Sequence, residues 1–181
     1  MKPAYKQFLI YTFKFLGVFA IAYFGTIAWI GLAAPGNYYS PFIDQHLDYV
    51  SWLRSSLLHT SRWFLDISGT QTVIPDAYSL QVVNGVSIHI GYDCIGYGVM
   101  SFWLAFVVAN KGSFLRKGVW VGVGLLAIWL INILRICLFL VTLNKKQTMP
   151  FGLDNHTFFN ITAYIAIFIM IWVFDKRKSY K

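Results

Sequence analysis

An unbroken apolar stretch near the N-terminus limits what this chain can fold into. From Phe8 to Ala34 almost every residue is apolar, and polar residues such as Lys14 and Thr26 are the exceptions. About 20 residues of α-helix, each rising 1.5 Å, cross the hydrocarbon core of a bilayer. The stretch therefore predicts a membrane-spanning helix at about residues 13–32. It is too long for the apolar region of a cleavable signal peptide.

Three further apolar stretches predict three more spans, at about residues 95–110, 118–141 and 157–174. The composition agrees, because 57% of the residues are hydrophobic and only 12% are charged. A soluble domain of this length could not hide so much apolar surface from water. The predicted fold is all-α and integral to the membrane, a single domain over residues 1–181 with a bundle of about four transmembrane helices.

Residues 35–92 form the longest segment that is not expected to cross the membrane. The Ser40-Pro41 pair is typical of a helix start. Apolar residues then recur at helical spacing, which predicts an amphipathic helix of about residues 42–67 in the membrane interface. Polar residues, Arg54 among them, fill much of its other face, and Gly69 is a suitable place for it to end.

A β-hairpin is predicted after this helix. The Asn84-Gly85 pair lies between segments rich in β-forming residues, which is a strong hairpin signal. We place the strands at about residues 77–83 and 86–92. The hairpin then leads the chain directly to Cys94, at the expected start of the second span.

The distribution of Lys and Arg predicts the orientation. If both termini are cytoplasmic, the segment 35–92 is extracytoplasmic, and ten Lys and Arg residues lie inside against four outside. This bias favours that orientation. The ten are Lys2, Lys6, Lys14, Lys111, Arg116, Lys117, Lys176, Arg177, Lys178 and Lys181, and the four are Arg54, Arg62, Lys145 and Lys146.

The charge and the cysteines exclude several classes of function. The net charge of +8 could indicate nucleic-acid binding, but the basic residues lie in short clusters beside the apolar spans, which is a topology signal. The two cysteines, Cys94 and Cys137, are too few for a disulfide framework, and no Cys/His spacing suits a metal. We therefore expect no nucleic-acid partner, no metal and no cofactor.

Three residues share one depth in this topology. Cys94 and His156 each begin a span at the outer face. Arg135 follows Gly118, the start of its span inside, by about 17 residues, which is about 26 Å of a roughly 30 Å core. The sequence thus predicts that Cys94, Arg135 and His156 form one site at the extracytoplasmic face.

The chemistry of these side chains suits acyl transfer. A thiolate is a good nucleophile, and a helix N-terminus would lower the pKa of the thiol. Histidine can act as a general base and then a general acid, and Arg can stabilise a thiolate or an oxyanion. Four residues are candidates for supporting roles: Asn132 one turn before Arg135, Asn160 one turn after His156, and Asp93 and Gly96 beside Cys94.

Plainer interpretations remain open for each residue. A membrane cysteine is usually a small buried apolar residue, as we expect for Cys137, which lies about 200° around its helix from Arg135. Arg135 can reach toward lipid head groups, and Asp93 can be a helix N-cap only. The shared depth of Cys94, Arg135 and His156 favours a joint site.

Taken together, these motifs resemble the exosortase/archaeosortase family. They are Cys94-Ile95-Gly96 at the start of a membrane helix, Asn132-Ile133-Leu134-Arg135-Ile136 late in the next, and His156 opening another. Many members carry Ser where this chain has Ile95, and many are longer. The chain resembles a short form of the kind seen in Bacteroidetes-like bacteria.

The resemblance implies a membrane-embedded cysteine transpeptidase in the bacterial inner (cytoplasmic) membrane. The family is thought to process exported proteins with a C-terminal motif, a transmembrane helix and a basic cluster. It implies Cys94 as nucleophile with Arg135 and His156 assisting, and an amine acceptor or water receiving the thioester. Membrane lipid is the other expected partner. The alternative is a non-enzymatic transporter or assembly subunit in which Arg135 binds an anion or a lipid head group.

Overall fold

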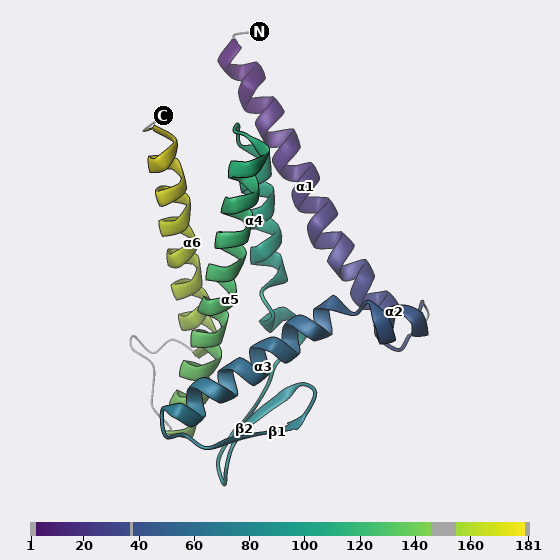
Figure 1. Cartoon of the computed structure of the whole chain (residues 1–181), viewed down its shortest axis with the longest axis vertical. Helices are drawn as coiled ribbons and strands as arrows, with labels where there is room; N and C mark the ends of the chain where they lie inside the picture. Colours follow the sequence, from purple (N-terminus) through teal and green to yellow (C-terminus); the bar gives the residue numbers. More distant parts are fainter. Residues whose placement is uncertain (1–2, 37, 146–154, 180–181) are drawn as a thin grey trace. The chain divides into compact units, whose positions relative to one another are not determined.

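The structure is a computed structural model that describes residues 3–36, 38–145 and 155–179 (Figure 1). For some of these, His156 and Asn160 among them, only the backbone is described. The chain is mostly helical. In chain order the elements are α1 (Pro3–Ala33), α2 (Pro41–His46), α3 (Tyr49–Ile67), β1 (Thr72–Asp76), β2 (Ser79–Val82), β3 (Ser87–His89), the 3₁₀ turn η1 (Tyr92–Cys94), α4 (Tyr97–Ala109), α5 (Phe114–Asn144) and α6 (Asn155–Ser179).

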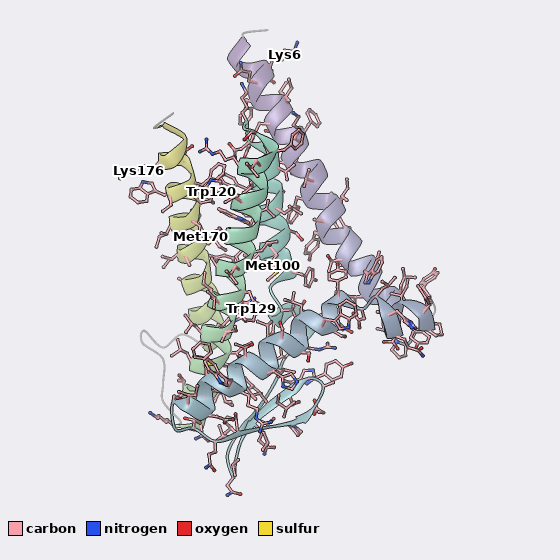
Figure 2. All side chains as sticks on the ribbon, in the orientation of Figure 1. Lys6, Met100, Trp120, Trp129, Met170 and Lys176 are labelled. Atoms are coloured by element: carbon pink, nitrogen blue, oxygen red, sulfur yellow. The ribbon has the colours of Figure 1, made fainter. Side chains whose placement is uncertain are left out.

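Two of the described helices are long and apolar enough to cross a membrane. They are α1, over Tyr5–Ala33, and α5, over Phe114–Asn144. Large apolar side chains project from the helices (Figure 2), and Phe13 and Ile21 of α1 are 73% and 77% exposed. Lipid is the environment that such surfaces require. The helix α4 is apolar too, but its 13 residues extend only about 20 Å.

The contacts of the chain divide it into two compact units, of which the first comprises residues 1–52 and 96–126. In this unit α1 packs along α4. Aromatic rings of α1 stack at four-residue intervals, from Tyr11 through Phe15 and Phe19 to Tyr23. Tyr23 then stacks on Tyr97, the first residue of α4, with the ring centroids 5.4 Å apart.

A glycine allows α5 to approach α4 closely in the same unit. Trp103 of α4 is fully buried, and its indole nitrogen donates a 3.0 Å hydrogen bond to the carbonyl oxygen of Trp120. A Cβ atom added at Gly124 would overlap the indole of Trp103. The absence of a side chain at Gly124 therefore creates the space that Trp103 fills.

The predicted amphipathic helix of residues 42–67 is wrong in one respect, because it is two helices. The expected start is observed, with Ser40 as N-cap and Pro41 in the first turn of α2, although the Ser40 hydroxyl makes no capping bond. The chain breaks after Leu47, and α3 begins anew. Asp48 caps it, since its carboxylate accepts a 3.0 Å hydrogen bond from the backbone N–H of Ser51.

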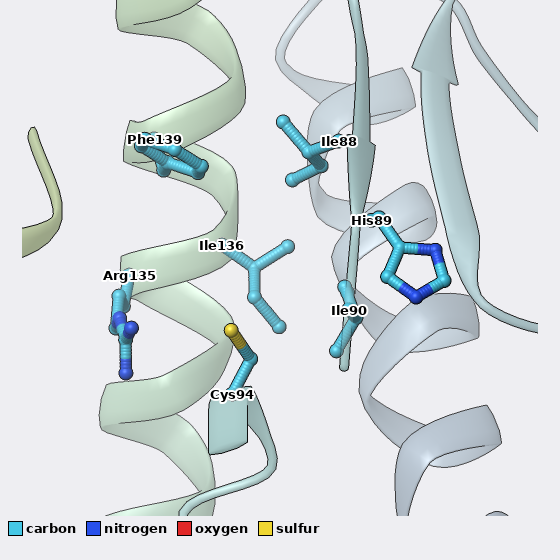
Figure 3. A pocket seen from close by; sticks show the side chains of 7 residues that line it. All are labelled: Ile88, His89, Ile90, Cys94, Arg135, Ile136 and Phe139. Carbon is cyan, nitrogen blue, oxygen red and sulfur yellow. The ribbon is translucent and has the colours of Figure 1, made fainter. Parts of the chain in front are cut away.

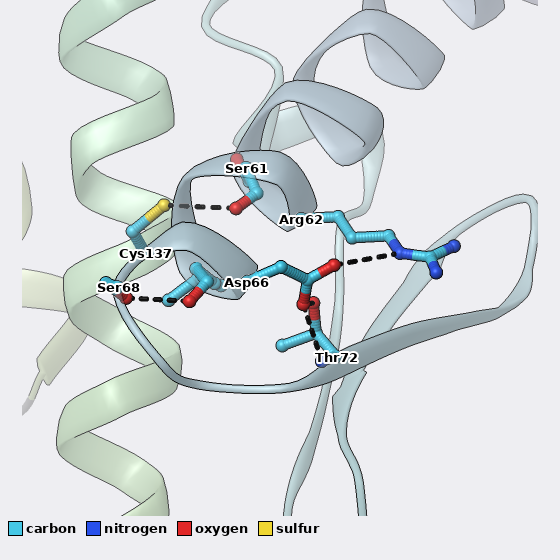
Figure 4. Close-up of polar contacts among 7 residues, drawn as sticks. Ser61, Arg62, Asp66, Ser68, Thr72 and Cys137 are labelled. Atoms are coloured by element: carbon cyan, nitrogen blue, oxygen red, sulfur yellow. Dashed lines mark hydrogen bonds and ion pairs between the residues drawn. The ribbon is translucent and has the colours of Figure 1, made fainter.

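The second unit comprises residues 53–95 and 127–181. Within it, α3 ends where the sequence predicts, at Gly69, which has a φ of 87°. The backbone N–H of Gly69 donates a hydrogen bond to the carbonyl oxygen of Asp66, and the N–H of Thr70 donates one to the carbonyl oxygen of Leu65. This pair of bonds is the Schellman arrangement. This end is joined to β1 by Asp66, whose carboxylate accepts hydrogen bonds from the N–H and hydroxyl of Thr72 at 2.8 and 2.9 Å (Figure 4).

The Asp66 carboxylate also meets Arg62 one turn earlier in α3, with Nε and Oδ2 3.4 Å apart. Desolvation tends to raise the pKa of Asp66, but the hydrogen bonds from Thr72 and Arg62 outweigh it, and the pKa lies below its ordinary value of 3.8. The ionised form of Asp66 is therefore the one that holds β1 against α3.

The three strands form one antiparallel sheet in the order β1-β2-β3. The strands β2 and β3 are joined by a tight turn at the predicted position, with Asn84 in the left-handed region at a φ of 56°. The sheet also contains β1, which the sequence did not predict. The side chain of Asn144 from α5 abuts the turn, since a Cβ at Gly85 would overlap its Oδ1.

Candidate active site

A small pocket in the second unit brings Cys94 and Arg135 together (Figure 3). It contains about 40 Å³ of room, enough for a few water molecules. Figure 3 shows the sulfur of Cys94 directed toward Ile136 of α5, and Arg135 extends from the other side of that helix in this view. The residues that line the pocket come from β3, η1 and α5 and the segment after β3: Ile88, His89, Ile90, Cys94, Arg135, Ile136 and Phe139.

The sequence predicted Cys94 at the N-terminus of a long helix, and this prediction is wrong. It is the last residue of the 3₁₀ turn η1, and α4 begins three residues later at Tyr97. The N-cap of α4 is Gly96, which has a φ of 84°, a conformation that favours glycine. Asp93 is consequently not the N-cap of α4 and lies exposed within η1.

Asn132 holds the chain beside the thiol. It is buried on α5, and its side-chain amide nitrogen donates a 2.8 Å hydrogen bond to the carbonyl oxygen of Ile95. Ile95 follows Cys94 directly and is itself fully buried. Asn132 therefore fixes the backbone next to the nucleophile candidate.

Arg135 is half-buried and lines the pocket from α5. Cys137, two residues further, donates a 3.6 Å hydrogen bond from its thiol to the carbonyl oxygen of Ser61 in α3 (Figure 4). Both cysteines are free thiols. Cys137 thus packs against α3 in a structural position, whereas Cys94 opens on the pocket.

Arg54, Tyr78 and Tyr92 form a cation–aromatic cluster next to the residues of the pocket, and the sequence did not predict it. Arg54 of α3, expected on a polar face, is only 3% exposed. Its guanidinium carbon lies 4.0 Å from the ring centroid of Tyr78 and 5.1 Å from that of Tyr92. Stacking of this kind stabilises a buried cation. Because Tyr92 belongs to η1, Arg54 helps to position the turn that carries Cys94.

His89 is a second pocket residue that the sequence did not predict there, and it lies exposed on the strand β3. It lines the pocket from β3, but its imidazole is turned away from Cys94 (Figure 3) and stacks on Tyr78 at 5.6 Å. Its backbone and Cβ are therefore the parts that face the pocket. The sequence shows a tyrosine and a histidine on the two arms of the predicted hairpin. Only the pairing of the strands shows that the rings of Tyr78 and His89 stack.

The remaining predicted residues fall outside the described side chains. His156 and Asn160 lie in the first turns of α6, where the structure describes only the backbone. Of the predicted trio, the structure therefore brings together Cys94 and Arg135. Among the described residues, no group of three His, Cys, Asp or Glu side chains could hold a metal ion.

Comparison with known proteins gives one match. The family model described as Transmembrane exosortase (Exosortase_EpsH) matches residues 8–173, which is most of the chain. No curated protein and no solved structure matches.

Proposed function

Since this chain belongs to the transmembrane exosortase family, we propose that it is a membrane-embedded cysteine transpeptidase that processes the C-terminal sorting tails of exported proteins. The family generally comprises membrane transpeptidases that act in protein sorting. The observation that carries the proposal is the pocket that Cys94, with its thiol, and Arg135, with its guanidinium group, both line. That pairing joins a nucleophile to a group that can stabilise negative charge.

The proposed reaction proceeds by acyl transfer through Cys94. The thiol proton passes to His156, and the thiolate adds to the scissile carbonyl while Arg135 stabilises the oxyanion. The C–N bond then breaks, the leaving amine takes the proton from His156, and a thioester remains on Cys94. An amine acceptor or water then gives a proton to His156 as it attacks the thioester, the C–S bond breaks, and the departing thiolate takes that proton back to restore the Cys94 thiol.

The proposed setting is the bacterial inner membrane, with both termini cytoplasmic and the pocket at the extracytoplasmic face. The helices α1, α4, α5 and α6 would provide four crossings, with α4 the short one, and the segment 35–92 would lie outside. The substrate's tail would enter as a transmembrane helix beside these helices, surrounded by lipid. We also propose that the chain is a short form of the family.

The test is tail removal in membranes. A host exported protein ending in a short motif, an apolar helix and a basic cluster is tagged at its C-terminus and co-expressed with the full chain. We expect Cys94→Ala to leave the tag attached and Cys137→Ala, the matched control, to release it as the wild type does. Tag release that persists in the Cys94→Ala variant would refute the mechanism.

The same assay separates the non-enzymatic alternative, in which even the wild-type chain releases no tag. If Arg135 only binds an anion or a lipid head group, Cys94→Ser leaves that binding unchanged and Arg135→Lys weakens it. In the transpeptidase, Cys94→Ser abolishes tail removal, and Arg135→Lys lowers its rate by about 10²–10³-fold, as loss of an oxyanion donor does.

A further inference from the structure

The two outer strands of the sheet differ in whether they can accept another strand. An outer strand offers unpaired N–H and C=O groups to any extended chain that comes near it. On one side, β1 contains Pro75 and an irregular register between Val73 and Asp76, features that block such pairing. On the other, β3 contains no proline and is the outer strand among the residues that the structure describes.

The pairing of β2 with β3 shows which backbone groups are directed outward. Ile90 donates a 2.7 Å hydrogen bond to the carbonyl oxygen of Tyr78. Hydrogen-bonded and non-hydrogen-bonded pairs alternate along an antiparallel ladder, so the neighbouring pair Ser79 and His89 is of the second kind. The N–H and C=O of His89, and those of Ser87 two residues earlier, therefore point away from β2.

These outward groups adjoin the pocket that contains Cys94. Ile88, His89 and Ile90 form one of its walls. The imidazole of His89 is turned away from it (Figure 3), which leaves the backbone as the polar part of that wall. A chain paired along the outer edge of β3 would thus lie beside the pocket that Cys94 also lines.

We propose that the cleavage motif of the substrate binds as an added strand along the outer edge of β3, pairing with the backbone of Ser87 and His89 and presenting its scissile carbonyl to Cys94. This inference rests on the proposed function and names how that site recognises its substrate. Main-chain pairing supplies affinity and the pocket supplies selectivity, as in other strand-addition sites. With about 40 Å³ of room between Ile88 and Ile136, the pocket suits a small side chain next to the scissile bond.

Site-specific photocrosslinking tests the docking edge in the full-length chain. A benzoylphenylalanine is placed at Ser87 on β3 or, as the matched control, at the exposed Val73 on β1, in a Cys94→Ala background that retains substrate. The tagged host protein described above is the probe. We expect a crosslink between position 87 and the motif of the substrate, and at least tenfold less at position 73.

Three outcomes would overturn the proposal: equal crosslinking at both positions, none at position 87, or a product at position 87 that joins two copies of this chain. The proposed function fails separately. If Cys94 is required for tail removal but position 87 does not crosslink to the substrate, the docking edge is wrong and the transpeptidase stands.

A pair of variants separates the backbone of His89 from its ring. His89→Pro removes the outward N–H without touching the bonds to β2, whereas His89→Ala keeps that N–H and removes the imidazole. We expect Pro to raise the KM for the tagged substrate about 3–10-fold, the loss of about one hydrogen bond, and Ala to raise the KM clearly less, because it keeps the outward N–H. An equal effect of the two variants would exclude pairing through the backbone.

Discussion

At the scale of single residues, the hydrogen bond from Asn132 to Ile95 is the most informative contact near the site. Both residues are buried, and the bond joins α5 to the backbone that follows Cys94. A buried carbonyl that loses its donor costs about 1–3 kcal/mol. Asn132 is therefore a positioning residue, since it acts on the nucleophile candidate through Ile95.

We expect Asn132→Leu, which keeps the size and removes the donor, to lower the kcat for tail removal up to about tenfold while the KM stays close to the wild-type value. The same variant should change the rate at which a maleimide alkylates Cys94, measured in a Cys137→Ser background. Leu134→Ala, at an exposed position of α5, is the matched control. An unchanged alkylation rate in Asn132→Leu would show that the bond does not position the thiol.

At the residue level, the proximity of Cys94 and Arg135 could be expected from the sequence, whereas their depth in the membrane and their catalytic roles stay predictions. Counting residues along the spans assigned Cys94 and Arg135 to one level, and both line the same pocket. The burial of Arg54 could not be predicted, because a charged residue in an amphipathic helix is expected to face water. Its burial depends on Tyr78 and Tyr92, which lie 24 and 38 residues away in the chain and meet it only after the hairpin has formed.

At the scale of elements, the junction between α3 and β1 depends on the ionisation of Asp66. A carboxyl group with a lowered pKa stabilises the fold above its unfolded pKa, and that contribution is lost as the pH falls through the lower folded value. The window for Asp66 therefore lies below its ordinary pKa of 3.8.

Replacing Asp66 with Asn should lower the stability of the protein by about 1 kcal/mol at neutral pH. The difference from the wild type should shrink as the pH falls below about 4. Thermal unfolding of both proteins in detergent between pH 7 and pH 3 measures this difference in stability. Asp76 is present in both proteins, so its contribution to the pH dependence cancels in the difference. A constant gap across this range would mean that the charge of Asp66 is unimportant.

Element boundaries show which signals are local. The end of α3 at Gly69 is set by one left-handed residue, so the sequence predicts it. The break before α3 also has a local signal, because Asp48 is a good N-cap. Apolar residues recur at helical spacing on both sides of Asp48, however, and this pattern predicted one continuous helix. The strand β1 could not be predicted, since Pro75 lies within it and its pairing partner β2 follows a turn.

At the scale of the whole molecule, the orientation in the membrane can be tested directly. Lys111 lies in the loop between α4 and α5, and Arg116 and Lys117 lie in the first turn of α5. The excess of such residues favours the cytoplasmic side. In a Cys94→Ala, Cys137→Ala background, we expect Ser113→Cys to react with an impermeant maleimide only after spheroplasts are lysed.

Ser87→Cys in the hairpin is the matched control and should react in intact spheroplasts. The opposite pattern would invert the topology and remove the pocket from the extracytoplasmic face. Hydropathy predicted where α1 and α5 lie but not their lengths, because both helices extend beyond the expected ranges 13–32 and 118–141, to Pro3–Ala33 and Phe114–Asn144. The helix α4 is slightly shorter than the expected range 95–110, because the turn η1 and Gly96 precede it.

The contact between Trp103 and Gly124 restricts how this fold can change over evolutionary time. The indole occupies the volume that any side chain at position 124 would need. A larger residue at position 124 is tolerated only after position 103 has become smaller, and the reverse order passes through a clash. The two positions are therefore epistatic, and the order in which substitutions arise decides which of them can be retained.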